Sequence, residues 1–198
     1  KILKKLILSL FDGHHVRVSV LIKTSKEAAS NFQEQLGYRL RTKDVPYKFI
    51  KYPSADQIKL ASGPLWIGPL MDKEIAGRLT EECAIQTCLP TSDELEELIA
   101  KGLAWSDKDV EYATREMIRS VKHISSAADL LSRQHMLLSL NSMPRLAGTK
   151  GAPKMDDVIS DLIELGYSAA RYPDMEPMFV TDASFDDVIS IFRKYHYD

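Results

Sequence analysis

The sequence is poor in the features that mark secreted, membrane-spanning and zinc-binding proteins. Its 198 residues include two cysteines, Cys83 and Cys88, which are too few and too close in sequence for a disulfide framework or a four-ligand zinc site. The apolar run over residues 2–10 is interrupted by Lys4 and Lys5, and no small-residue cleavage site follows it. These absences favour a protein of the reducing cytoplasm without a membrane or metal partner.

The sequence also lacks a recognisable catalytic or cofactor site. Residues 44–47, Asp-Val-Pro-Tyr, are similar to the acid-Pro-Pro-Tyr loop of amino methyltransferases, but no Gly-rich strand-to-helix turn precedes them, and a β-turn explains them. The adjacent His14 and His15 would point to opposite faces of a strand, so they cannot share a metal ion. His123, His135 and His196 stand alone. We therefore predict no catalytic, cofactor-binding or metal-binding residue in this chain.

Charge is distributed unevenly along the chain, although the net charge is only −2. Residues 1–60 carry 12 basic and 5 acidic side chains (+7), residues 71–130 carry 7 and 13 (−6), and residues 131–198 carry 7 and 10 (−3). Only the first third has the electrostatics of a polyanion-binding protein. Lysines that merely keep the surface soluble are the alternative explanation.

Residues 1–70 are predicted to form a small basic α+β domain with a mixed or antiparallel sheet. The spacing of apolar residues over 2–10 predicts a helix, and residues 16–23 alternate as a strand does. A capping box at residues 24–27 opens a second helix, which we expect to end at Gly37. Three short strands are predicted over 38–42, 47–52 and 57–60.

From residue 71 the patterns become helical, and they predict an acidic helical segment over 71–126. One helix is expected over 71–88, a second over 91–101, and a third from the cap at Ser106 to Ile124. Residues 127–198 show the element order of a winged-helix unit, although the acids of its third helix would repel phosphates. Its predicted helices cover 127–139, 142–147, 155–165 and 185–195, and its strands lie near 168–171 and 178–181.

Residues 62–75, SGPLWIGPLMDKEI, are the most informative stretch of the chain. Two Gly-Pro pairs bracket Leu65, Trp66 and Ile67, and a helix that begins with an acid follows. Proline fixes φ and glycine permits positive φ, so the pairs hold a short apolar strand at a set angle to the helix. We expect Trp66 to be largely buried where the sheet part meets the helical part.

Three separated motifs together resemble one protein family. The chain resembles the C-terminal half of the S-adenosylmethionine-dependent tRNA N2,N2-dimethylguanosine (guanine-26-N2) methyltransferases, archaeal type. The family has an Asp-His-Tyr-(Phe/Val)-Arg strand start, a Gly-Pro-(Leu/Val)-Trp-(Leu/Ile)-Gly-Pro-Leu motif followed by an acid, and a terminal Gly-Tyr and Arg pattern. The matching positions are His14 and Arg17, then residues 63–70 with Asp72, then Gly166, Tyr167, Arg171 and Thr181.

The resemblance implies that the chain binds tRNA and holds no cofactor itself. The S-adenosylmethionine site and the catalytic acid would lie N-terminal of Lys1, in a methyltransferase domain that would be the second partner besides tRNA. The terminal hairpin departs from the family pattern, because it has lost a histidine and a lysine and gained Asp174 and Glu176. We therefore expect this hairpin to contact tRNA poorly.

The resemblance and the charge distribution together place the expected RNA contacts in the first third of the chain. The candidates are Arg17, Arg39, Arg41, Lys43, Lys48 and Lys51, with Arg171 as the one basic residue kept in the hairpin. The residues expected to shape the domain interface are His14, Gly63, Pro64, Trp66, Gly68 and Pro69. A contiguous basic stripe on the surface would favour the RNA role.

Two other functions stay open at this point. A non-catalytic protein-interaction module that kept the fold is favoured by the acidic hairpin and the acidic third helix, and scattered lysines would support it. The second is an independent enzyme, for which residues 44–47 are the only support in the sequence.

Overall fold

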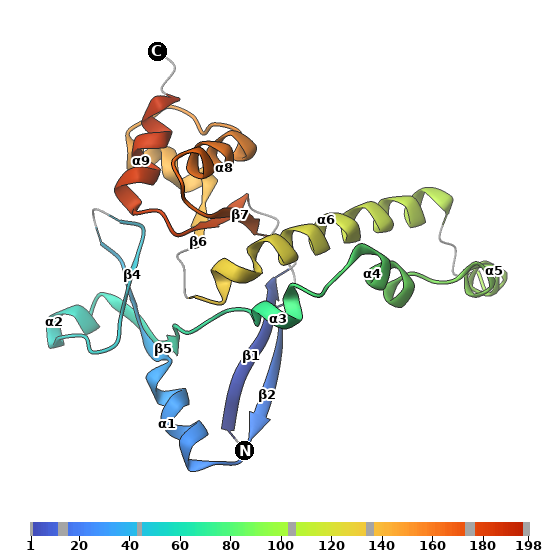
Figure 1. The fold of residues 1–198 in the computed structure, drawn as a ribbon, viewed down its shortest axis with the longest axis horizontal. Coiled ribbons are helices and arrows are strands. Elements are labelled where there is room, and N and C mark those ends of the chain that lie inside the picture. Colours follow the sequence, from blue (N-terminus) through green and yellow to red (C-terminus); the bar gives the residue numbers. More distant parts are fainter. Residues whose placement is uncertain are drawn as a thin grey trace.

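The computed structural model describes residues 2–11, 16–42, 45–102, 106–133, 137–172 and 177–195. Over these ranges the chain is a mixed α/β protein with three small antiparallel sheets and a set of helices (Figure 1). The predicted combination of helices with small sheets is confirmed at this level. In the described part of the chain, no helix is both long and apolar enough to cross a membrane.

The first sheet is a hairpin of two strands, β1 (Ile2–Phe11) and β2 (Val16–Lys23). The helix predicted over 2–10 is therefore wrong. The ladder shifts register twice within β1, first after Leu3 and again after Leu6. Each irregularity moves the residues that follow to the other face of the strand. Apolar residues consequently recur along β1 at intervals that resemble those of a helix.

The second sheet has β3 (Leu36–Leu40) at its centre, between β4 (Lys48–Ile50) and β5 (Ala61–Trp66). Strands were expected at β3 and β4. The strand predicted over 57–60 is wrong, because α2 (Ala55–Ile58) occupies its first half and a turn the second. A reciprocal capping box of the serine and glutamine at positions 54 and 57 stabilises this short helix.

Helix α1 (Lys26–Glu34) lies between the first two sheets in the chain and begins at N-cap Ser25, one residue after the threonine that opens the predicted capping box. It ends three residues before Gly37, the predicted stop. Gly37 instead lies in β3, where an added Cβ would approach the carbonyl oxygen of Ile50 to 2.9 Å. Close packing of the strands, and not a helix end, therefore requires this glycine.

The single helix predicted over 71–88 is in fact two helices, α3 (Lys73–Ala76) and α4 (Glu81–Cys88). Each begins with its own N-cap, because the side chains of Asp72 and Thr80 accept hydrogen bonds from backbone N–H groups of the first turn. The second cap interrupts what the apolar spacing alone presents as one continuous pattern.

Helices α5 (Ser92–Ala100) and α6 (Asp107–Leu131) form an arm together with α4 (Figure 1). The 25 residues of α6 form one continuous helix, so the separate helix predicted over 127–139 is wrong. The buried alanines Ala127 and Ala128 continue the apolar face, and packing of this face carries the helix past the serines before them. The end of the predicted helix is a strand, β6 (Leu137–Ser139).

The C-terminal unit is a three-stranded sheet with the order β6-β8-β7, covered by short helices. Its core contains the fully buried side chains of Leu162, Phe179 and Phe192. Most of the elements predicted here are confirmed to within a few residues. They are η1 (Leu140–Ser142), α7 (Met143–Ala147), α8 (Met155–Glu164), β7 (Ala169–Tyr172), β8 (Met178–Thr181) and α9 (Phe185–Lys194).

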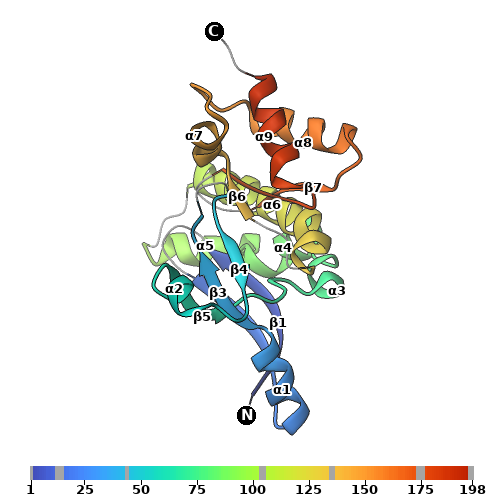
Figure 2. The ribbon, with the colours of Figure 1, turned by 90° about the vertical axis from the view of Figure 1, so that its left-hand side faces the viewer.

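A second core joins the parts of the molecule. Met71, at the end of the Gly-Pro motif, is buried with Leu131 of α6 and Val180 of β8. The Tyr172 hydroxyl donates a hydrogen bond to the Ser9 carbonyl oxygen at 3.1 Å, which ties β7 to β1. Figure 2 shows the result, with the C-terminal unit at one end of the molecule and α1 at the other.

Candidate nucleic-acid interface

Arg39 is the predicted RNA-binding residue whose position the structure defines best. It is the exposed residue of β3, and its guanidinium carbon stacks 4.4 Å from the ring centroid of Tyr47. The Tyr47 hydroxyl donates to the Leu137 carbonyl oxygen at 2.7 Å and accepts from the Leu137 N–H at 3.0 Å. Burial raises the pKa of Tyr47, whereas the hydrogen bond with the Leu137 backbone and the positive charge of Arg39 lower it. This unit fastens the second sheet to β6.

The remaining candidates in this sheet do not share one face. Arg39 faces Phe49 across the ladder, whereas Lys48 faces Leu40. Neighbouring residues of a strand point to opposite faces, so Arg39 and Lys48 lie on opposite sides of the sheet. Arg41 follows β3 and is exposed. The structure therefore divides the predicted cations of this sheet between its two faces.

Two of the predicted cations have acidic partners. Lys51 donates to Glu34 at 2.7 Å, and this hydrogen bond holds the pKa of the Glu34 carboxyl below its usual value. Arg171 on β7 pairs with Asp156 of α8 at 2.7 Å. Arg17 lies on exposed β2, in the first sheet. Of the other predicted residues, His14 and Lys43 lie outside the described residues, as do Asp174 and Glu176 of the hairpin.

The Gly-Pro motif forms β5 and the turn after it. Trp66 pairs with Leu36 of β3, and its Nε1–H donates to the Pro69 carbonyl oxygen at 2.9 Å. An added Cβ at Gly63 would approach the Tyr38 ring to 2.7 Å, and one at Gly68 would approach the Trp66 ring to 2.8 Å. Both glycines are therefore required by close packing. Pro64 follows Gly63 through a cis peptide bond.

Trp66 is buried over most of its surface, in agreement with the predicted burial, and a smaller part stays exposed. Its ring lies 6.1 Å from that of Phe32 on α1, and both rings line a hollow of about 520 Å³ between β1, α1 and the motif. Lys4, Lys5 and Asp72 line the same hollow. The motif thus sets the distance between the first two sheets and leaves a space there instead of a closed core.

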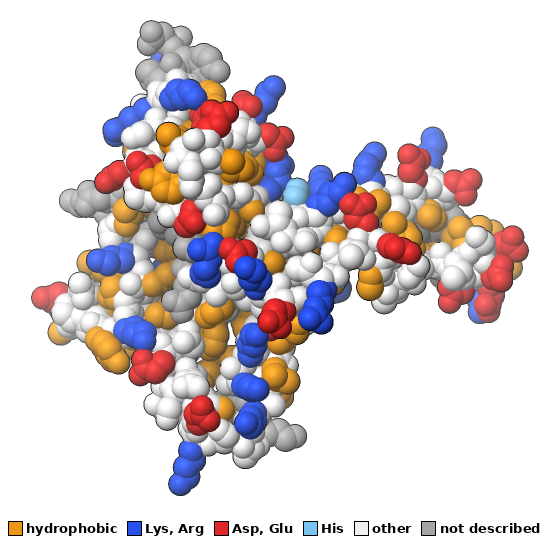
Figure 3. Space-filling view, viewed as in Figure 1, with side chains coloured by type: hydrophobic (Ala, Val, Ile, Leu, Met, Phe, Trp, Pro, Cys, Tyr) orange, Lys and Arg blue, Asp and Glu red, His pale blue; other side chains and the backbone are white. Residues whose placement is uncertain are grey.

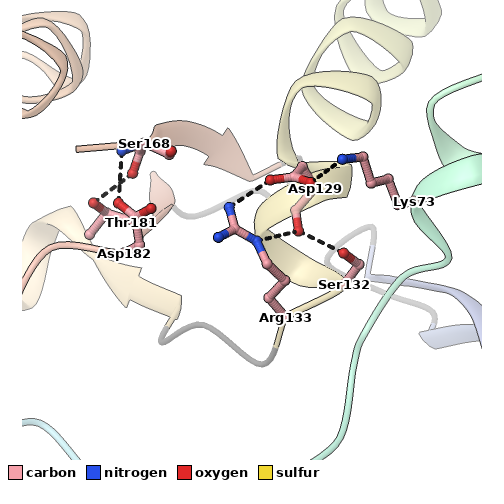
Figure 4. A network of polar contacts seen from close by, with 7 residues as sticks. All are labelled: Lys73, Asp129, Ser132, Arg133, Ser168, Thr181 and Asp182. Carbon is pink, nitrogen blue, oxygen red and sulfur yellow. Dashed lines mark hydrogen bonds and ion pairs between the residues drawn. The ribbon is translucent and has the colours of Figure 1, made fainter. Parts of the chain in front are cut away.

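A polar network connects α3, directly after the motif, to the end of α6 (Figure 4). The Asp129 carboxylate accepts from Lys73 at 2.5 Å and from Arg133 at 2.6 Å. The hydrogen bond from Lys73 is the main reason that the pKa of Asp129 lies below its usual value. In the neighbouring C-terminal unit, Ser168 N–H donates to Asp182, which joins the residue before β7 to the residue after β8. The network thereby holds α3 against the end of α6.

One set of cations was missed by the sequence analysis. Lys108, Arg115, Arg119 and Lys122 are all exposed and all lie on α6. Their spacing of seven, four and three residues was the available signal, and it was obscured by the net negative charge of residues 71–130. In the described residues, no group of three or more His, Cys, Asp or Glu side chains is placed to hold a metal ion.

Comparison with known proteins identifies the family. A family model described as N2,N2-dimethylguanosine tRNA methyltransferase matches residues 1–137, which is more than half of the chain. The chain belongs to this family. The match includes the hairpin of β1 and β2, the Gly-Pro motif and all of α6. The family that the three motifs resemble is therefore confirmed.

Curated members of the dimethylguanosine methyltransferase family match different shares of the chain. A tRNA (guanine(26)-N(2))-dimethyltransferase from Pyrobaculum calidifontis is 32% identical over 108 residues, which are 54% of this chain and 28% of that protein. The enzyme of the same name from Thermococcus kodakarensis is 24% identical over 191 residues, 96% of this chain and 42% of that protein. The chain thus spans less than half the length of these relatives.

A solved structure shows the same fold. Trm1 from Pyrococcus horikoshii, determined in complex with S-adenosyl-L-methionine, superimposes with a TM-score of 0.64 at 21% identity. The similarity covers 94% of this chain and 43% of that chain. Almost the whole of this member of the dimethylguanosine methyltransferase family therefore folds like one part of a longer relative.

Proposed function

We propose that this chain is the tRNA-binding and tRNA-positioning portion of an S-adenosylmethionine-dependent tRNA guanine-N2 dimethyltransferase. In this proposal the cofactor and the catalytic acid belong to a methyltransferase domain outside this chain. The observation that carries the proposal is strand β2. All eight of its residues are exposed, and among the described residues it pairs with β1 alone, in a chain that spans less than half of its relatives.

Strand β2 has the composition of a strand that another part of a protein covers. Val16, Val18 and Ile22 are 68%, 50% and 55% exposed and share one face, while Leu21, 45% exposed, lies on the other. A long apolar strand with a free edge pairs readily with further chains, and proteins normally protect such edges. The opposite face carries three polar residues beside Leu21, so the valine face is the one that we expect to be covered. We therefore propose that β2 docks against the methyltransferase domain.

The proposed task of this chain is to position tRNA. Cations of residues 1–60, together with Arg171, would bind phosphates and hold the tRNA, while the target guanine is flipped into a pocket built by the other domain. Arg17, Arg41 and Lys48 support this role, since none of them has an acidic partner in the described part of the chain. Such a protein would work in the cytoplasm.

The proposal includes a winged-helix-like C-terminal unit. The order α6, β6, α7, α8, β7, β8 and the sheet order β6-β8-β7 support it. We also propose the division into a basic sheet subdomain (1–70), an acidic helical segment (71–126) and this unit (127–198), with α6 bridging the last two. The acids of α8 take part in local ion pairs, such as that of Asp161 with Lys194 at 2.8 Å.

Binding of an unmodified tRNA transcript at several salt concentrations tests the proposed function. We expect the chain to bind, with an affinity that falls as salt rises, because phosphate contacts release counterions. Replacing Arg39, Arg41 and Lys48 with glutamine should reduce the slope of log affinity against log salt by about 0.7–0.9 for each phosphate that is no longer bound. Glutamine at Lys150 and Lys154 is the control, because the four acids of α8 follow this pair in the chain. Absence of tRNA binding by the unmodified chain would instead support a protein-interaction module.

A further inference from the structure

The exposed face of α6 carries a continuous row of cations. Lys108, Arg115, Arg119 and Lys122, called the α6 stripe below, fall within a sector of about 60° when each residue turns the helix by about 100°. Four of the buried residues of α6 lie on the opposite face: Val121, Ile124, Ala128 and Leu131. The row is about 21 Å long at 1.5 Å per residue, which is sufficient for several phosphates of one nucleic-acid strand.

Further basic groups meet the inner end of the stripe, where β7 packs against α6. Arg171 extends from β7, and the partly buried His123 lies near both Arg171 and Arg119. Burial, then the positive charges of Arg171 and Arg119, lower the pKa of His123, and Asp156 of α8 opposes them weakly. Figure 3 shows basic side chains following α6 outward from a histidine beside the C-terminal unit.

The acids nearest the stripe are the exposed Glu111, between Lys108 and Arg115 in the chain, and the partners of Arg119 and Lys122. Lys108 and Arg115 have no acidic partner in the part of the chain that the structure describes. Arg119 pairs with Glu116, and Lys122 pairs with Glu81 of α4 at 3.1 Å. Exposed ion pairs of this kind are weak, so phosphate oxygens can replace the carboxylates. Many acids of residues 71–130 lie on α5, at the far end of the arm (Figure 3).

An aromatic side chain accompanies the cations. Tyr112 is 59% exposed, and the Arg115 guanidinium carbon lies 5.5 Å from its ring centroid. Because Tyr112 and Arg115 are three residues apart, they are neighbours on the helix surface. Cations interleaved with an exposed aromatic ring are typical of surfaces that hold single-stranded RNA, where the ring stacks on a base.

We infer that the α6 stripe is an RNA-binding surface of this protein, with Tyr112 as a stacking platform for an unpaired base. The stripe tracks phosphates of one strand outward from the corner between β7 and α6. This inference rests on the proposed tRNA-binding function, and it adds a second surface, on a segment of negative net charge, to the cations of residues 1–60.

The test compares two variants with the same change in charge. The stripe variant carries Lys108→Gln, Arg115→Gln and Arg119→Gln. The control variant carries Arg145→Gln, Lys150→Gln and Lys154→Gln, three exposed cations of the C-terminal unit outside both proposed surfaces. Binding of a tRNA transcript is measured over a range of salt concentrations, and circular dichroism verifies that α6 remains helical in the stripe variant.

We expect the slope of log affinity against log salt to be about 2 units shallower for the stripe variant, at 0.7–0.9 per phosphate bound. The control should bind as the unmodified chain does. Tyr112→Ala should weaken binding by about 5- to 150-fold without changing the slope, as removal of one stacking platform does.

The outcomes separate the inference from the function on which it rests. If the unmodified chain binds tRNA and the stripe variant matches the control, the stripe is not an RNA surface and the proposed function stands. If the unmodified chain does not bind tRNA, both the inference and the proposed function are overturned. The α6 stripe would then suit an acidic protein surface instead.

Discussion

At the scale of single residues, Asp72 is the acid on which the junction of the molecule depends. It is 5% exposed, and both carboxylate oxygens are engaged. One accepts from the backbone N–H groups of Glu74 and Ile75 at the start of α3, and the other pairs with Lys5 of β1. Lys5 is the main cause of its lowered pKa, the two backbone N–H groups add to the effect, and burial opposes it.

Replacing Asp72 should therefore destabilise the protein in a pH-dependent way. We expect Asp72→Ala to lower the free energy of unfolding by about 1–2 kcal/mol at neutral pH, as the loss of an N-cap does. Asp72→Asn keeps a capping oxygen and loses the ion pair, so its effect should be smaller. Urea unfolding at a series of pH values provides the measurement.

The pH dependence of this effect has a defined direction. The pKa of Asp72 is lower in the folded than in the unfolded protein, so its charge stabilises the fold above the unfolded pKa of about 3.9. This stabilisation is lost as the pH falls through the folded pKa. The difference between the unmodified chain and Asp72→Asn should shrink below about pH 4. An equal difference at pH 7 and pH 3 would contradict the assignment.

Gly68 offers a second test at the residue scale. A Cβ at this buried position would lie 2.8 Å from the Trp66 ring, so Gly68→Ala should cost about 1–3 kcal/mol of unfolding free energy through overpacking. Gly151 is exposed, and its Cβ would meet no atom within 4 Å, which makes Gly151→Ala the matched control. Thermal unfolding of both variants checks the prediction. Equal stability would show that the Trp66 ring is free to move.

At the scale of elements, substitutions in the hairpin of β1 and β2 can test whether β2 is a docking strand without its partner. Val18 and Val20 are 50% and 43% exposed, so Val18→Lys with Val20→Lys should change the unfolding free energy by less than about 0.5 kcal/mol. The same variant should bind less of a hydrophobic dye and self-associate less at high concentration. A loss of several kcal/mol would mean that these valines are packed in the isolated chain.

Element boundaries were predictable where local chemistry decided them. Ser25, Ser106 and Ser184 each begin a helix through their own side-chain oxygen, and the sequence carries that information within four residues. The structure of residues 2–10 depends instead on pairing with β2. That strand lies outside the ten residues whose apolar spacing predicted a helix. Packing of Ala127 and Ala128 likewise continues α6 where the sequence pattern changes.

At the scale of the whole molecule, the proposal predicts that this chain alone is catalytically silent. We expect the 198-residue chain neither to bind S-adenosylmethionine nor to methylate tRNA, since its sequence has no Gly-rich strand-to-helix turn for the cofactor. Calorimetric titration with the cofactor provides the measurement, and the full-length Thermococcus kodakarensis relative is the positive control. Micromolar binding by the chain itself would place the cofactor site here and overturn the proposed division of labour.

The sequence by itself determined the family and the positions of most helices and strands. The Gly-Pro motif with Trp66 and the acid after it gave the strongest signal of the family. The steric demands on its glycines and prolines and the helix cap at Asp72 are local, so they are visible in the sequence. Only the tertiary structure decided which cations share a surface. It separated Arg39 from Lys48 and placed Arg171 of β7 near His123 of α6, since a sheet register and the packing of a strand on a helix depend on residues distant in sequence.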